Sequence, residues 1–129
     1  MRTQTVTFEY DPGRNILFTV DDYEVMCPED ADKFFALYQQ QLAQIGKKVH
    51  LVTNIDRLYI APHMEEHYGE VARKVSREWI LKFARYGDMA ISRVGIAIAA
   101  QKADFVTSVH KTREEAVAAV LAAGDGGRG

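Results

Sequence analysis

The chain has 129 residues, of which 47% are hydrophobic and 26% are charged, values that are ordinary for one globular domain. Its formal net charge of −2 excludes the basic excess by which proteins bind nucleic acid or anionic membranes. A single cysteine allows no internal disulfide, and the first residues (MRTQTVTFEY) lack the pattern of a secretory or transit peptide. We therefore expect a cytoplasmic protein without a membrane span.

Two short strands are predicted at the start of the chain. Apolar and polar residues alternate over residues 5–10 and again over 16–20, which is the period of a strand with one buried face. The apolar residues of this pattern are Val6, Phe8 and Tyr10, then Ile16, Phe18 and Val20. Between the two strands, residues 11–15 (DPGRN) provide the proline and glycine of a tight turn, so the pattern predicts a hairpin.

A first helix is predicted to begin at Pro28, because proline suits the first helical position and two acidic residues follow it. Gly46 is expected to end this helix. Its apolar stripe comprises Ala31, Phe34 or Phe35, Tyr38, Leu42 and Ile45. Residues 49–55 (VHLVTNI) then have apolar side chains on both faces, which is typical of a buried parallel strand.

A second helix is predicted to begin at Pro62. The apolar residues along one of its faces are Met64, Tyr68, Val71 and Val75. Residues 79–86 are typical of a strand nearer the edge of a sheet, because they include two charged side chains. A third helix is predicted after Asp88, which would cap it, over the apolar run from 91 to 100.

The end of the chain is expected to form a strand and a closing helix. The strand residues are Phe105, Val106 and Val109. Residues 112–115 (TREE) form a capping box, and the helix would turn Ala116, Val117, Val120 and Leu121 inward. Residues 124–129 have nothing to bury, so we expect them to be disordered and residues 1–123 to form one domain. The order of elements predicts an α/β domain with a mixed sheet.

This order, β-β-α-β-α-β-α-β-α, resembles the STAS domain and more closely its SpoIIAA-like branch. Residues 105–108 (FVTS) followed by 112–116 (TREEA) are similar to the ending of that branch, a strand and then a helix opened by an xxEEA signature. The resemblance covers nearly the whole chain. It implies a central, mostly parallel sheet with helices packed on it, and a non-enzymatic regulatory module that binds a protein partner or a small anionic or lipid-like ligand.

The phosphorylation site of the STAS family is missing from this sequence. In the family members that antagonise anti-sigma factors, a phosphorylatable serine lies at the start of the second helix. The corresponding residues here, 60–64 (IAPHM), contain no hydroxyl group, and the neighbouring Tyr59 does not suit a Ser/Thr kinase. The resemblance therefore implies partner binding without a phosphoserine switch.

Two alternatives belong to other functional classes. Residues 51–58 (LVTNIDRL), with Tyr68, Arg85-Tyr86 and the box at 112–115, are similar to a segment at the C-terminus of some bacterial CoA-transferases. That likeness implies an accessory protein of CoA-dependent acyl metabolism. The other alternative is a structural homodimer, formed through the third helix or through Ala118, Ala119 and Ala122 of the last helix.

Two sets of residues match catalytic motifs loosely. Residues 63–67 (HMEEH) fit the H-x-x-E-H pattern of a group of zinc hydrolases, in which Glu66 occupies the glutamate position. His63, His67 and Glu70 share one side of the predicted helix and could approach one metal ion. These side chains lie off the apolar stripe of the helix, so we interpret the motif as a solvated helical turn and not as a zinc site. Cys27 precedes a helix, where a thiol can be reactive, but a small residue near the cap is the simpler interpretation. We predict no catalytic residue, metal or cofactor.

A binding surface is predicted where two strands end. The residues expected just past the third strand are Asn54, Asp56, Arg57 and Tyr59, and those that end the fourth strand are Arg85, Tyr86 and Asp88. Ligands of open α/β sheets bind outside the carboxyl ends of parallel strands. Arg57 and Arg85 would act there as forked donors to an anion or a partner's carboxylate. Residues 56–63, including His63, and the second helix would complete the surface. The alternative is that Asp56 and Arg57 are solvated loop charges and that Arg85 pairs with Asp88.

Overall fold

The computed structural model describes residues 4–88 and 108–122. Its elements are β1 (Thr5–Asp11), β2 (Ile16–Val25), α1 (Pro28–Ile45), β3 (Val49–Ile60), the 3-10 turn η1 (Pro62–Met64), α2 (Glu65–Trp79), β4 (Ile80–Tyr86), β5 (Ser108–His110) and α4 (Arg113–Leu121). The predicted third helix, the strand residues Phe105 and Val106, and the predicted disordered tail lie outside the described residues.

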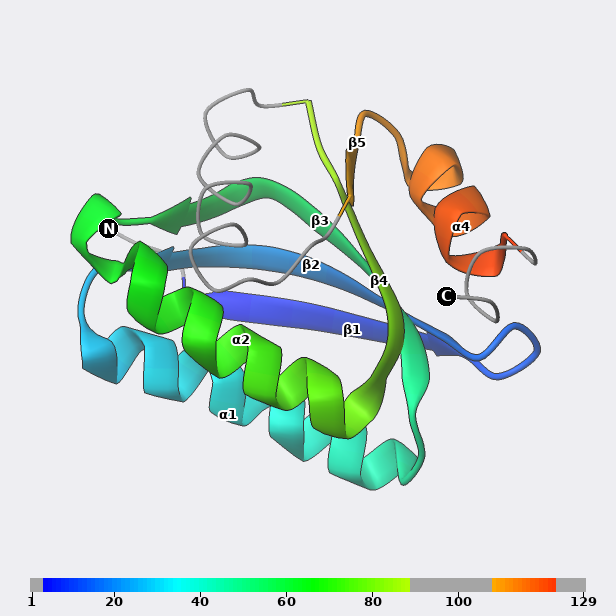
Figure 1. Cartoon of the computed structure of the whole chain (residues 1–129), viewed down its shortest axis with the longest axis horizontal. Helices are drawn as coiled ribbons and strands as arrows, with labels where there is room; N and C mark the ends of the chain where they lie inside the picture. Colours follow the sequence, from blue (N-terminus) through cyan, green and yellow to red (C-terminus); the bar gives the residue numbers. More distant parts are fainter. Residues whose placement is uncertain (1–3, 89–107, 123–129) are drawn as a thin grey trace.

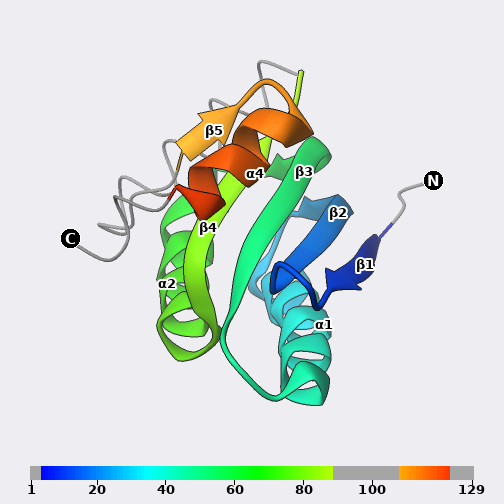
Figure 2. The same ribbon diagram turned by 90° about the vertical axis from the view of Figure 1, so that its right-hand side faces the viewer.

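The five strands form one sheet in the order β1-β2-β3-β4-β5. The pair β1–β2 is antiparallel, and the pairs β2–β3, β3–β4 and β4–β5 are parallel. Helices α1 and α2 lie side by side on one face of this sheet, while α4 packs on β3 and β4 from the other face (Figures 1 and 2). The prediction of an α/β domain with a mixed, mostly parallel sheet is therefore confirmed.

The hairpin forms where the sequence predicts it. Asn15 adopts a left-handed conformation with a φ of 57°, and its side chain accepts a hydrogen bond from the Tyr10 hydroxyl at 2.7 Å. The buried pattern of β2 differs from the prediction. Ile16, Leu17 and Phe18 are all buried, because α4 covers one face and α1 the other, whereas Val20 is exposed.

Strand β3 is longer than predicted. It continues beyond residue 55 to Ile60. Its pairing with β2 contains a bulge: Val20 pairs with Asn54, but Asp22 pairs with Arg57. Strand β3 therefore has one more residue than β2 between these two pairs. Leu58 and Ile60 then return to the buried face. The expectation that Asp56, Arg57 and Tyr59 follow the strand is wrong, because they are part of it.

Both long helices follow the sequence signals closely. Helix α1 begins at Pro28 and ends at Ile45, where Gly46 caps it with a φ of 81°. It buries both Phe34 and Phe35. The helical region from Pro62 starts with the turn η1 before α2 proper begins at Glu65. Trp79 is the last residue of α2 and not the first residue of the next strand.

Helix α4 is capped as predicted but is less buried than predicted. The Thr112 hydroxyl accepts a hydrogen bond from the Glu115 N–H at 3.1 Å. Ala116 and Val120 are buried against β2, β3 and β4, but Leu121 is exposed, so its predicted inward position is wrong. Of the small residues predicted to form a dimer contact, Ala118 is exposed and Ala119 and Ala122 are half-buried.

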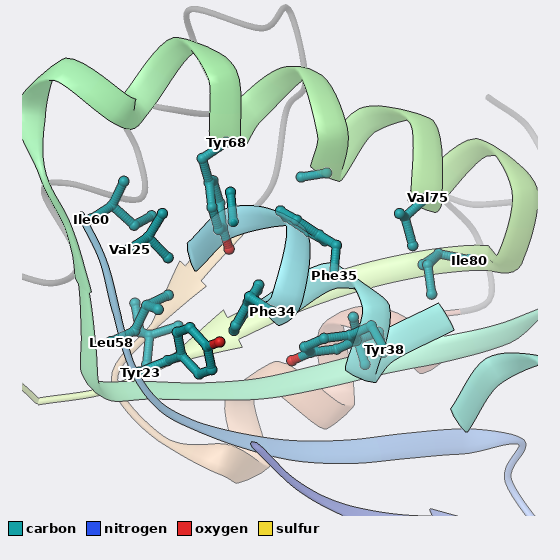
Figure 3. Packing of buried hydrophobic residues seen from close by; sticks show 14 of the residues in the cluster. Tyr23, Val25, Phe34, Phe35, Tyr38, Leu58, Ile60, Tyr68, Val75 and Ile80 are labelled. Atoms are coloured by element: carbon teal, nitrogen blue, oxygen red, sulfur yellow. The ribbon is translucent and has the colours of Figure 1, made fainter. Parts of the chain in front are cut away.

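The larger core lies between the sheet and the helices α1 and α2, and aromatic rings fill its centre. The Phe34 ring lies 5.0 Å from the Tyr23 and Phe35 rings and 5.2 Å from the Tyr38 ring, between ring centroids. Tyr68 points from α2 toward these rings (Figure 3). This aromatic cluster forms one side of the site described next.

Candidate functional site

Charged side chains are buried on the sheet face beneath α1 and α2. Asp21 of β2 and Arg85 of β4 are each only 2% exposed. Between them on β3 lies Thr53, which pairs in register with Thr19 of β2 on one side and with Arg85 on the other. We call Asp21, Thr53 and Arg85 the charged row. Lysine, arginine, aspartate and glutamate are almost never fully buried unless they are paired, so the burial of Asp21 and Arg85 needs an explanation.

Hydrogen bonds connect Asp21 to α1 and to the neighbouring strand. The Tyr38 hydroxyl donates to Asp21 Oδ1 at 2.6 Å, and the same hydroxyl lies 2.8 Å from Thr19 Oγ1. The Thr19 hydroxyl also lies 2.8 Å from Thr53 Oγ1. Three buried hydroxyl groups and one carboxyl group therefore form a continuous chain across β3, β2 and α1.

Arg85 extends the same row toward α2. Its guanidinium carbon lies 4.0 Å from the centroid of the Phe83 ring, and its positive charge acts on the Tyr68 phenol. Its positive charge also acts on Asp21. The Tyr38 phenol thus lies next to Asp21, and the Tyr68 phenol lies next to Arg85.

These side chains border a cavity between the sheet and the two helices. The cavity is partly open to solvent, and the centre of a water-sized sphere can occupy about 20 Å³ of it, enough for roughly one or two water molecules. Its lining consists of Asp21, Phe34, Phe35, Tyr38, Leu51, Tyr68, Ala72, Val75, Ser76, Ile80, Phe83 and Arg85. Ser76 and Phe83 are the half-buried members of the lining and mark the side that faces solvent.

Burial changes the protonation of the acidic groups in this cavity. It raises the pKa of Asp21 to about 7, against the opposing effects of the Tyr38 hydrogen bond and the Arg85 charge. Burial likewise raises the pKa of Tyr38 well above its ordinary value and that of Tyr68 to about 12. At neutral pH both phenols are therefore uncharged, while Asp21 is near its midpoint.

Arg57 and Arg85 do not meet at the predicted surface. Arg85 faces inward, toward Asp21 and Tyr68, and so it also does not form the predicted alternative pair with Asp88. The Arg57 side chain is 70% exposed, and its Nε lies 3.3 Å from Asp22 Oδ2. The prediction of two forked donors at one rim is therefore wrong.

Three other predicted residues do come together. Asp56 Oδ1 accepts a hydrogen bond from the Asp88 N–H at 2.6 Å, and Asp56 Oδ2 accepts one from Asn54 Nδ2 at 3.3 Å. The Asp56 carboxyl therefore holds the turn that follows β4. The remaining predicted residues lie apart from this group. The exception is Tyr86, which pairs in register with Asn54 but packs its side chain against the core under α4. Tyr59 is exposed, and His63 Nε2 lies 2.8 Å from the Met26 carbonyl oxygen.

The histidine motif forms no metal-binding group in residues 4–88 and 108–122. Within these ranges no group of three or more histidine, cysteine or acidic side chains could hold a metal ion, so His63, His67 and Glu70 are not a ligand set. Glu66 is exposed on α2, and Cys27 is half-buried at the start of α1.

The sequence did not predict Asp21 and Tyr38 as members of a binding site. The signal for Asp21 was present, because position 21 continues the alternation of Leu17, Thr19, Tyr23 and Val25, all of which face inward. The predicted second strand ended at residue 20, so this alternation was not recognised at position 21. Tyr38 was identified only as a core residue of the first helix, and its hydroxyl partner lies on a different element.

Comparison with protein families, with curated proteins and with solved structures finds no match for this chain. Over the parts of the chain that the structure describes, no helix is both long and apolar enough to cross a membrane.

Proposed function

We propose that this chain is a non-enzymatic, STAS-like binding module of the cytoplasm that holds a small, mostly apolar ligand in the cavity under α1 and α2. The observation that carries the proposal is the pair Asp21 and Arg85, both 2% exposed and both lining this cavity. Burying such groups is costly, and strongly perturbed acids in a cleft often mark functional sites.

The cavity has the character of a binding site for an amphipathic molecule. Its walls are formed by the apolar side chains of both helices and of β3 and β4, including Phe35, Leu51 and Val75. The polar groups of Asp21, Tyr38, Tyr68 and Arg85 offer specific contacts to one polar group of a ligand. Small-molecule sites typically combine mostly apolar walls with a few placed polar groups.

A variant that fills the cavity tests the proposal. Ala72 is buried and lines the cavity, so Ala72→Leu should occupy the space a ligand needs. Ala36 is exposed on α1, and Ala36→Leu is the matched control. We expect at least one compound of a set of five-carbon alcohols, amides, acids and amines to raise the melting temperature of the wild type and of the control, but not of Ala72→Leu. If no compound distinguishes the wild type from Ala72→Leu, the cavity is not a ligand site. Ser76→Leu, at the open side, replaces Ala72→Leu if that variant does not fold.

A second candidate function is recognition of a protein partner, the function expected from the sequence. It is favoured by exposed apolar side chains near Arg57: Tyr59 is 41% exposed and Met26 is 39% exposed, and both lie toward the same end of β2 and β3. A partner would bury these side chains and use the exposed Arg57 as a charged contact.

Arg57→Ala tests this second function. The ion pair of Arg57 with Asp22 is exposed, so its loss should change the free energy of unfolding by no more than about 0.5 kcal/mol. We expect an affinity pull-down from the native cytosol to recover a partner with the wild type and to lose it with Arg57→Ala. Recovery of the same proteins with both would exclude this surface. The accessory role in CoA-dependent metabolism and the homodimer stay predictions, the latter to be checked by light scattering.

A further inference from the structure

We propose that the cavity selects a ligand whose polar group is uncharged and donates a hydrogen bond to Asp21, such as the hydroxyl of a short alcohol. This inference rests on the proposed ligand-binding function and specifies the chemistry of its ligand. It follows from the state of the two carboxyl oxygens of Asp21 and from the charges that face them.

The two oxygens of Asp21 are used unequally. Oδ1 accepts the hydrogen bond from Tyr38 at 2.6 Å. Among the described residues, no backbone or side-chain group donates to Oδ2. Asp21 is nevertheless 2% exposed and lines the cavity. Oδ2 is not among the fully buried side-chain atoms that lack a partner in the described structure, so it is accessible from the cavity that Asp21 lines, and a ligand in the cavity can donate to it.

The charge of the surrounding groups limits which donor fits. The titratable side chains that line the cavity in the described structure are Asp21 on β2, Tyr38 on α1, Tyr68 on α2 and Arg85 on β4. An ammonium group would donate to Asp21 but would lie beside the permanent charge of Arg85 in a poorly hydrated site. A carboxylate would repel Asp21 and could not donate to it. A hydroxyl or a primary amide donates without either penalty.

The size of the cavity sets how much of the ligand enters. Space for roughly one or two water molecules admits a polar end group and the first carbons of a chain. The remaining carbons would lie toward the open side, against Phe83 and Ser76. Short chains are therefore the appropriate probes.

The experiment compares five probes with the same five-carbon body and different polar ends: pentan-1-ol, pentanamide, pentan-2-one, pentylamine and pentanoate. Binding is measured by chemical-shift titration at about pH 8, where most Asp21 is ionised. We expect the alcohol and the amide to bind about tenfold or more tightly than the ketone, the amine and the acid, because only these two donate while uncharged.

Asp21→Asn provides the matched test, because it keeps the shape of the side chain but can present a donor in place of the acceptor. We expect this variant to lose the preference for the alcohol over the ketone. Asp22→Asn, on the neighbouring half-buried position that pairs with Arg57, should keep the wild-type preference.

The outcomes separate the two proposals. Tighter binding of the amine or the acid, or equal binding of all five probes, would overturn the inference while the cavity remains a binding site. An alcohol preference that persists in Asp21→Asn would also overturn it. No binding of any probe to the wild type would remove the proposed function and the inference together.

Discussion

The charge of a single carboxyl group should control part of the stability of this protein. Burial raises the pKa of Asp21 from an ordinary 3.8 to about 7, so the folded state binds a proton that the unfolded state releases between these two values. The contribution is present in full below pH 3.8 and is lost progressively as the pH rises to about 7. The loss is on the order of 4 kcal/mol.

Asp21→Asn should remove this dependence. We expect the free energy of unfolding of the variant, relative to the wild type, to rise as the pH increases from about 5 to about 8, because only the wild type acquires a buried charge over that range. Urea unfolding of both proteins at several pH values measures the difference, and the other titrating groups cancel in it. A difference that stays constant with pH would show that Asp21 titrates normally.

Gly87 is required by close packing and not by backbone conformation. A Cβ added at this position would lie 2.7 Å from Asp56 Oδ1 and 3.3 Å from Ile55 Cγ1. The Asp56 carboxyl cannot move away without losing its hydrogen bond to the Asp88 N–H. We expect Gly87→Ala to lower the free energy of unfolding by about 1–3 kcal/mol in chemical denaturation. The control is Gly13→Ala, whose added Cβ would make an ordinary contact of 3.4 Å with Asp11, and equal effects of the two changes would refute the explanation.

At the scale of single elements, α4 depends on its cap more than the longer helices do on theirs. It has nine residues, and its buried residues are Ala116 and Val120. We expect Thr112→Ala to lower the free energy of unfolding by about 1 kcal/mol, because the Glu115 N–H loses its acceptor. Thr112→Ser keeps a hydroxyl and should be close to the wild type in the same urea titration. A serine variant as unstable as the alanine variant would mean that the methyl group, not the cap, matters.

The elements with local signals could be predicted, and those that depend on distant partners could not. The hairpin turn and the start and end of α1 are encoded by proline, glycine and acidic residues at adjacent positions, and the structure confirms them. The end of β3 was missed because its extra residue after Asn54 interrupts the alternation from which a strand is recognised. The site was missed for a related reason, since the burial of Asp21 depends on Tyr38 and Arg85, which lie on two other elements.

On the scale of the whole molecule, different kinds of side chains cover the two faces of the sheet. The face under α1 and α2 carries the aromatic cluster, the charged row and the cavity, whereas the face under α4 is covered by a smaller, apolar cluster. Substitutions in α4 should therefore change stability without changing the properties of the cavity, whereas substitutions of Ala72 and Asp21 change the cavity and stability together. A change in α4 is thus a control for effects of stability alone in the binding experiments proposed above.

The order of the five strands in the sheet is also their order along the chain. During synthesis on the ribosome, each strand emerges when the strand it pairs with has already been made, and it adds to the growing edge of the sheet. None of the strands in the described residues has to be inserted between two strands that have already paired, and no completed pair among them has to open. The domain can thus assemble from its N-terminal hairpin onward, with the charged row closed only when Arg85 of β4 reaches the partly built sheet.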